Sequence, residues 1–362
     1  MRRLSVLRTS LIRLAGLAAL LFAVAPGPLG AQARDGGRDI SECRPLTGSF
    51  LQPLAQHGDW SQADWDVLME DLAAVGVRNL YLQWTKLDDF TVFDERPGEP
   101  VEPTLLDRVL RASAANGVKV WLGLVYSPSY WERVQRGPDQ LAVYLKRHRV
   151  AVRALAGQLQ NRVGGHPAVA GWYVTEEVDD VNWWASDKRQ LFRDHLRALT
   201  AELRAIAPAR PIAISGFTSV TLDPAAYAAL WRGLIAASGV DLVLFQDGGG
   251  VGTLSPAESD LYLTALAPAV RAAGAGFGVI VELFTQRAGP PLDDAPFAAG
   301  PGELDRIREQ IAVAADDADR LVGFSFPEYM SAGGGPAAAR LYREYRGWQE
   351  ACAGPGSRSG AE

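Results

Sequence analysis

Eight short apolar runs, each followed by a segment with helical spacing, constrain the fold of this chain more than any other feature of its sequence. The runs predict strands at Thr47–Gln52, Asn79–Trp84, Val118–Val125, Val169–Val174, Pro211–Phe217, Val240–Gln246, Phe277–Phe284 and Leu321–Phe326. Apolar runs that alternate with amphipathic helices are typical of parallel strands buried on both faces. The sequence therefore predicts a single α/β domain with the (β/α)8, or TIM barrel, fold.

The segments between the runs contain residues that begin and end helices. Ser61 and Asp64 resemble a capping box, and Gly76 follows the apolar positions of that helix. Further helices are expected at Leu105–Asn116, Asp139–Val163, Asp187–Ile206, Pro224–Ala237, Ser255–Ala273, Gly302–Ala315 and Gly335–Trp348. A doubly wound open sheet is the alternative, but no glycine-rich phosphate loop follows the first strand.

The two ends of the chain are expected to lie outside the barrel. Residues 1–33 combine four arginines, the apolar run Leu14–Val24 and small residues at Ala31-Gln32-Ala33, which is the pattern of a cleaved secretory signal peptide. An uncleaved membrane anchor is the alternative. We expect a leader at 34–46, the barrel at 47–350, a flexible tail at 351–362, no integral span after cleavage, and a periplasmic or secreted location.

Charge and cysteine content narrow the class of protein. The formal net charge of -6 becomes about -10 once the four arginines of the signal peptide are removed, which argues against nucleic acid as a partner. The only two cysteines, Cys43 and Cys352, flank the folded region. Because the first strand of a closed barrel lies beside the last helix, we predict a disulfide between them; two unrelated thiols are the alternative.

Barrel enzymes carry their chemistry where the strands end, and here those positions are rich in acids, amides and aromatic rings. The residues expected to bind substrate are Gln52, Gln83, Trp84, Tyr126, Glu176, Trp183, Gln246, Asp247 and Glu328. Aromatic platforms beside amides and carboxylates suit the apolar faces and hydroxyl belts of sugar rings. Loop packing is an equally good explanation for any single aromatic residue.

Two strand-end glutamates suggest the reaction. Hydrolysis of a glycosidic bond needs one carboxyl to protonate the departing oxygen and another to attack or to activate water. Glu282 stands in the apolar run GVIVELF, where a charge is costly unless it is used or paired. On the fourth strand either Glu176 or Glu177 could point inward, because alternate residues face opposite ways, and we favour Glu177.

Other chemistries lack their motifs. The sequence has no HExxH or clustered Cys/His set, no GxSxG elbow and no Walker motif. We therefore expect neither a metal site nor a cofactor.

The chain resembles the bacterial domain-of-unknown-function family numbered 4434, a barrel family grouped with glycoside hydrolases. The stretches that carry the resemblance are GSFLQP, WDVLMEDLAAVGVRNLYLQW, GWYVTEEVDDVNW, FQDGGGVG and VELF, in that order between Gly48 and Tyr345. By analogy with clan A of the retaining enzymes, the resemblance implies Glu177 as general acid/base and Glu282 as nucleophile. Clan A enzymes usually have Asn-Glu at strand four, whereas this chain has Glu176-Glu177.

Together these observations predict an exported glycoside hydrolase that cleaves a polysaccharide or oligosaccharide with two carboxyls. A retaining mechanism is favoured and an inverting one is the alternative. Families of this kind often accompany exopolysaccharide systems. The alternative from another class is a non-catalytic carbohydrate-binding barrel that assists exopolysaccharide processing or export, because a fold does not guarantee an activity.

Overall fold

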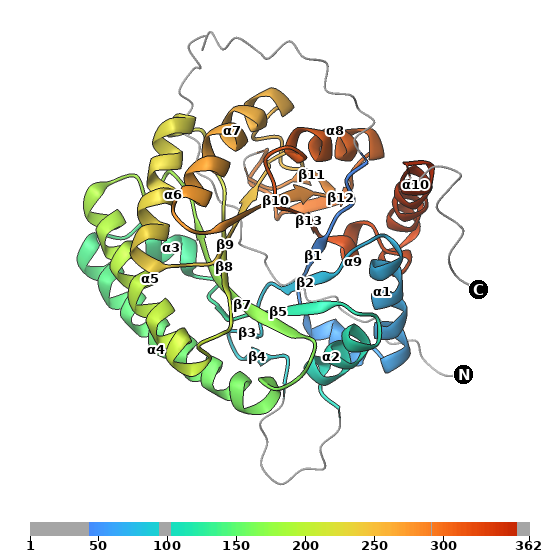
Figure 1. The fold of residues 1–362 in the computed structure, drawn as a ribbon, viewed down its shortest axis with the longest axis horizontal. Coiled ribbons are helices and arrows are strands. Elements are labelled where there is room, and N and C mark those ends of the chain that lie inside the picture. Colours follow the sequence, from blue (N-terminus) through green and yellow to red (C-terminus); the bar gives the residue numbers. More distant parts are fainter. Residues whose placement is uncertain (1–42, 94–102, 291, 353–362) are drawn as a thin grey trace.

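The computed structural model describes residues 43–93, 103–290 and 292–352 of the 362-residue chain. Eight strands close into a barrel in the order β1-β13-β10-β9-β8-β7-β5-β2, and helices surround it (Figure 1). All neighbouring strands of the barrel are parallel, so their carboxyl ends meet at one mouth. The predicted (β/α)8 fold is confirmed.

The observed elements overlap the predicted ones, with bounds that differ by a few residues. The barrel strands are β1 (Gly48–Leu51), β2 (Asn79–Leu82), β5 (Lys119–Gly123), β7 (Val169–Val178), β8 (Ile212–Gly216), β9 (Leu242–Gln246), β10 (Gly276–Glu282) and β13 (Arg320–Phe324). The long helices are α1 (Gln62–Ala74), α2 (Leu105–Ala115), α4 (Pro138–Val163), α5 (Ser186–Ile206), α6 (Pro224–Ser238), α7 (Pro256–Ala272), α8 (Leu304–Ala314) and α10 (Pro336–Cys352). Short helices are η1 (Ala55–Asp59), α3 (Tyr130–Val134), α9 (Phe326–Tyr329) and η2 (Ala332–Gly334).

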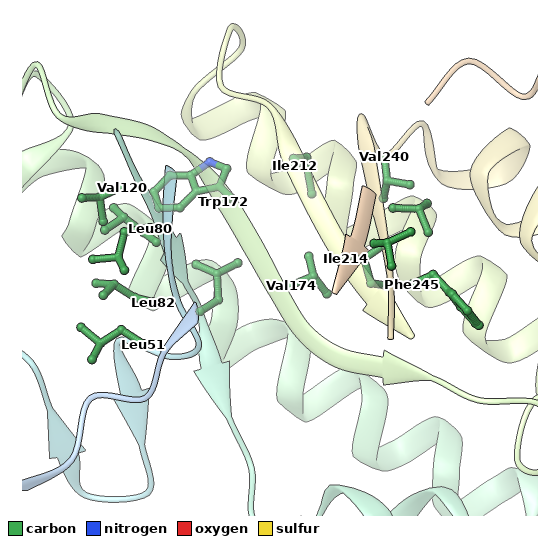
Figure 2. Packing of buried hydrophobic residues seen from close by; sticks show 14 of the residues in the cluster. Leu51, Leu80, Leu82, Val120, Trp172, Val174, Ile212, Ile214, Val240 and Phe245 are labelled. Carbon is green, nitrogen blue, oxygen red and sulfur yellow. The ribbon is translucent and has the colours of Figure 1, made fainter. Parts of the chain in front are cut away.

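The core has two layers because side chains alternate between the two faces of each strand. One layer fills the barrel and contains Phe50, Tyr81, Trp121, Tyr173, Ala213, Leu242, Leu244, Ile280 and Val322. The other lies between the strands and the helices, and Figure 2 shows its members Leu80, Leu82, Val120, Trp172, Val174, Ile212 and Ile214 along consecutive strands. On β2, for example, Tyr81 points inward while Leu80 and Leu82 point outward.

Two small sheets at the mouth do not follow from the apolar pattern. One pairs β3 (Lys86–Leu87) with β4 (Phe90–Thr91) and β6 (Val125–Tyr126), and the other pairs β11 (Phe284–Ala288) with β12 (Ala298–Pro301). The third predicted strand was therefore too long: it leaves the barrel after Gly123, and the chain then pairs with β3. At Gly123 a Cβ atom would lie 2.1 Å from the carbonyl oxygen of Leu82, so only glycine fits there.

The described N-terminal segment is fastened to the last helix. Cys43 and Cys352 form a disulfide with a Cα–Cα distance of 5.6 Å, as predicted. The backbone N–H of Leu46 donates to the buried hydroxyl of Tyr345 at 2.9 Å. The predicted signal peptide and most of the predicted leader and tail lie outside the described residues. Within the described ranges, no helix is long and apolar enough to span a membrane.

The disulfide closes a loop with a sequence separation of 309 residues. A crosslink over so long a loop removes much freedom from the unfolded chain, so the Cys43→Ser/Cys352→Ser double variant should lose about 3–5 kcal/mol of unfolding free energy. Urea titration of both proteins under non-reducing conditions measures the difference. Equal transition midpoints would show that the crosslink does not stabilise the fold.

Candidate active site

The alternation of side chains decides which strand-end residues face the barrel axis. Tyr173 is an interior residue of β7, so Glu177, four residues later, lies on the same face, although the pairing register shifts between Val174 and Val178. Gln246 lies two residues after the interior residue Leu244 on β9, so it also faces the barrel axis. Glu282 follows Ile280 on β10, and Gln52 and Gln83 follow Phe50 and Tyr81. These five polar residues form the inner ring of the mouth.

Glu177 is a half-buried carboxyl on the fourth barrel strand in chain order. The side-chain amide of Gln246 donates to its Oε1 at 2.7 Å, and the hydroxyl of Tyr130 donates to its backbone oxygen at 2.6 Å. Burial raises the pKa of Glu177 to about 7, and the charge of Asp179 adds to this effect. The hydrogen bond from Gln246 acts in the opposite direction. A carboxyl with that pKa is about half protonated at neutral pH and can give its proton to a bound ligand.

Glu282 ends the seventh barrel strand and is 4% exposed. Its Oε2 accepts hydrogen bonds from the backbone N–H groups of Gly250 and Val251 at 2.7 and 2.9 Å. A Cβ atom on Gly250 would lie 2.8 Å from Cβ of Glu282 and 2.5 Å from the carbonyl oxygen of Phe284. The glycine-rich loop after β9 therefore brings its backbone against this carboxylate in a way that a larger residue would prevent.

Asp247 points away from the barrel axis and packs beside Glu282. Its Oδ2 accepts from the side-chain amide of Gln310 at 2.6 Å, and its Oδ1 accepts from the backbone N–H of Gly249 at 3.1 Å. Burial and the charge of Asp247 raise the pKa of Glu282, although the two loop amides oppose this. Asp247 is itself 3% exposed, so the two carboxyls form one buried pair.

The remaining members of the mouth surround this pair. The side-chain amide of Gln52 donates to Oε1 of Gln83 at 2.7 Å. Glu328 in α9 is half-buried, and burial raises the pKa of its carboxyl to about 7. Burial and then the charges of Glu328 and Glu282 raise the pKa of Tyr329, which places that tyrosine near both carboxyls.

Three residues expected to contact substrate lie away from the mouth. Glu176 faces the helical layer, since it occupies the outward position between two inward ones. Trp84 is 1% exposed and its indole N–H donates to the backbone oxygen of Pro53 at 2.8 Å. Trp183 is fully buried and stacks on Phe192 with ring centroids 4.1 Å apart. Asp247 lies at the mouth, but its carboxyl is turned outward and accepts from Gln310 and Gly249. Tyr126 stays half-buried beside Trp84.

Glu176 is held by two buried histidines that sequence reasoning did not assign. His195 Nε2 on α5 and His148 Nε2 on α4 lie 2.9 and 3.2 Å from Glu176 Oε1. Burial alone would raise the pKa of Glu176, but the two histidines outweigh it and hold the pKa below its ordinary range. Burial would lower the pKa of His148, and the Glu176 charge outweighs it, so this pKa is raised.

Replacing Glu176 with glutamine should lower the unfolding free energy by about 3–5 kcal/mol near pH 5.5, because buried histidines lose their counter-charge. The depressed pKa of Glu176 contributes stability above about pH 4.5 that is lost as the pH falls. The raised pKa of His148 contributes stability below about pH 6.5 that is lost as the pH rises. Urea unfolding at pH 3, 5.5 and 8.5 should give the largest difference at the middle value. A constant difference would show that the charges play no part.

Further residues of the site came only from the structure. Arg306 on α8 donates from Nη1 to the backbone oxygen of Glu282 at 3.2 Å and from Nη2 to that of Phe284 at 2.6 Å. Gln310 holds Asp247 from the same helix. The sequence signal for the loop contacts is the glycine run that follows Asp247. In the described ranges, no group of three or more His, Cys, Asp or Glu side chains is placed to hold a metal ion.

Solved structures that resemble this barrel include proteins described as glycoside hydrolases. A "putative alpha-L-fucosidase" from Bacteroides thetaiotaomicron aligns with a TM-score of 0.66 and 20% identity, over 84% of this chain and 95% of its own. The endo-1,4-β-mannanase of Rhizomucor miehei aligns with a TM-score of 0.55 and 13% identity, over 85% and 95% of the two chains. Identities this low establish a shared fold and leave the activity open.

Sequence comparison gives the family. Residues 46–339 match the family described as Domain of unknown function (DUF4434), and the chain belongs to it. A relative from Escherichia coli strain K12, "Uncharacterized protein YbcH", is 30% identical over 256 residues, which is 69% of this chain and 81% of the relative. The resemblance recognised in the sequence is thereby confirmed.

Proposed function

We propose that this protein is an exported glycoside hydrolase that cleaves a polysaccharide or oligosaccharide with Glu177 and Glu282. The observation that carries the proposal is the pair of inward-facing carboxyls on the fourth and seventh strands of one barrel mouth. One of them is hydrogen-bonded by an amide side chain and the other by two backbone N–H groups. Paired carboxyls in different environments are what glycosidic bond cleavage requires.

Glu177 is assigned as the general acid. Its pKa of about 7 keeps the proton available at neutral pH, and protonation of the departing oxygen relieves the negative charge that bond cleavage would create there. The hydrogen bond from Gln246 fixes the orientation of the carboxyl toward the barrel axis. In a retaining mechanism the resulting carboxylate then takes a proton from the water that releases the product.

Glu282 is assigned as the nucleophile that attacks the anomeric carbon. Attack requires the ionised form, and the N–H groups of Gly250 and Val251 stabilise that form at Oε2. Asp247 opposes it, because two carboxylates so close to each other are not ionised together readily. We therefore assign one shared proton to the pair, and the reactive arrangement has that proton on Asp247.

The alternative function, a carbohydrate-binding barrel without catalysis, is favoured by one observation. The raised pKa of Glu282 disfavours its nucleophilic form in the empty site. The same inner ring of amides and carboxyls would still bind sugar hydroxyls. The two functions differ in whether new reducing ends appear, and that is the direct test.

The test is incubation of the purified mature chain with a panel of bacterial exopolysaccharides, followed by assay of reducing ends. The hydrolase predicts release from at least one polymer, and the anomer released first shows whether configuration is retained or inverted. Binding to a polymer without release of any reducing ends would support the alternative.

Export is tested separately. A purified periplasmic fraction of the native host is probed for the chain without its signal peptide, and its presence there would support export.

Replacing Asp247 with asparagine should shift the acid side of the kcat/KM profile to lower pH by about one unit. Removing the neighbouring negative charge lowers the pKa of Glu282, so the ionised nucleophile persists at lower pH. Asparagine keeps the size of the side chain and an oxygen for Gln310. An unchanged acid limb would contradict the coupling of Asp247 to Glu282.

A further inference from the structure

A second concave site lies on the flank of the barrel, outside the inner ring of the mouth. It is a pocket of about 520 Å³ lined by Ser129, Arg133, Asp139, Gln140, Val143, Tyr144 and Arg147. Gln140, Val143, Tyr144 and Arg147 are spaced three and four residues apart, so they share one face of α4. Arg133 comes from the facing short helix α3, and Ser129 directly precedes that helix. The volume falls in the range of small-ligand sites.

The charge of this flank pocket comes mainly from two arginines. Arg133 and Arg147 are exposed, and in the described residues neither has a carboxylate within ion-pair distance, although Asp139 lines the same pocket. On the same helix Arg149 pairs with Glu202 at 3.2 Å. Two guanidinium groups that line one concavity without an ion-paired carboxylate offer a site for an anion.

The other lining residues suit a sugar ring. Tyr144 and the 52% exposed Val143 provide apolar surface, and Ser129 and Gln140 can hydrogen-bond hydroxyl groups. The ring of Tyr144 also stacks on His148 with centroids 5.6 Å apart. His148 contacts Glu176, so the back wall of the pocket adjoins the strand that carries Glu177.

We propose that the flank pocket binds a carboxylate-bearing sugar, such as a hexuronate unit of the polymer, while the bond that is cleaved lies at the barrel mouth. This inference rests on the proposed hydrolase function. A planar carboxylate matches the fork of an arginine, and two arginines can hold its two oxygens together. The substrate class that fits both sites is a polysaccharide that contains neutral and acidic units.

The distribution of charge explains why the acidic unit binds away from the mouth. The mouth already contains the acids Glu177, Asp247, Glu282 and Glu328, and the burial that raises the pKa of Glu177, Glu282 and Glu328 also disfavours a further negative charge there. The flank pocket has two cations and one acid instead. A polymer that spans both sites would gain affinity from the pocket without bringing its charge to the reacting bond.

Binding of sodium glucuronate, measured by calorimetry and compared with glucose and inorganic phosphate, tests the pocket without any turnover. We expect glucuronate alone to bind, with affinity about 10-fold weaker in Arg133→Gln/Arg147→Gln and unchanged in Arg153→Gln. Arg153 is the matched control because it is an exposed arginine of the same helix. Equal binding by both variants, no binding of glucuronate, or binding of phosphate alone would overturn the proposal.

Hydrolysis of an acidic polymer and of its carboxyl-reduced form separates the pocket from the proposed function. The double variant should raise KM about 10-fold on the acidic polymer alone and leave kcat unchanged. Glucuronate binding without hydrolysis of any polymer would retain the pocket and remove the hydrolase function. Hydrolysis with the same KM for both polymers and both proteins would retain the hydrolase function and reject the pocket.

Discussion

Replacing Glu282 with glutamine should lower kcat on a cleaved polysaccharide by a factor on the order of 10⁴, because the amide cannot form the glycosyl bond that a carboxylate forms. The fold should survive, since the amide oxygen of glutamine can still accept from the N–H groups of Gly250 and Val251. The substitution also removes the repulsion between Glu282 and Asp247. Reducing-end assays at saturating substrate measure the loss.

Glu309→Gln is the matched control for this experiment. Glu309 is an exposed glutamate on α8, the helix that carries Arg306 and Gln310. Its replacement makes the same glutamate-to-glutamine change at a residue outside the mouth. This control should keep full turnover. If Glu282→Gln also kept it while remaining folded, Glu282 would not be the nucleophile, and Glu328 would be the next residue to replace.

The second large effect is expected at Glu177. Glu177→Gln should lower kcat/KM on the polymer by about 10²–10⁴, because the sugar alkoxide leaves poorly without a proton. An aryl glycoside with an acidic phenol as leaving group should be affected far less at the bond-cleaving step. In the wild type, activity should fall as the pH rises through about 7, where Glu177 loses its proton.

The contrast between substrates identifies the role of Glu177. A general loss of structure would lower both rates together, whereas loss of a general acid lowers the rate for the poor leaving group selectively. Glu176→Gln provides the comparison: it should change stability without this dependence on the leaving group, because its carboxyl contacts histidines outside the barrel. Equal losses on both substrates in Glu177→Gln would contradict the assignment.

The sequence determined the architecture and the places where chemistry can lie. The alternation of apolar runs and amphipathic helices specified eight parallel strands, and cysteines at both ends of the folded region specified the closing disulfide. These features are local or follow from barrel closure, so a pattern of hydrophobicity is enough to recover them.

Only the tertiary structure decided which strand-end residues work together. Asp247 follows Gln246 directly, yet Gln246 contacts Glu177 on the fourth strand while Asp247 packs beside Glu282 on the seventh. Trp183 looked suited to a sugar ring, but it stacks on Phe192, which lies nine residues further along the chain in α5. Burial and contacts across the barrel depend on how strands and helices meet, and no local pattern of residues encodes that meeting.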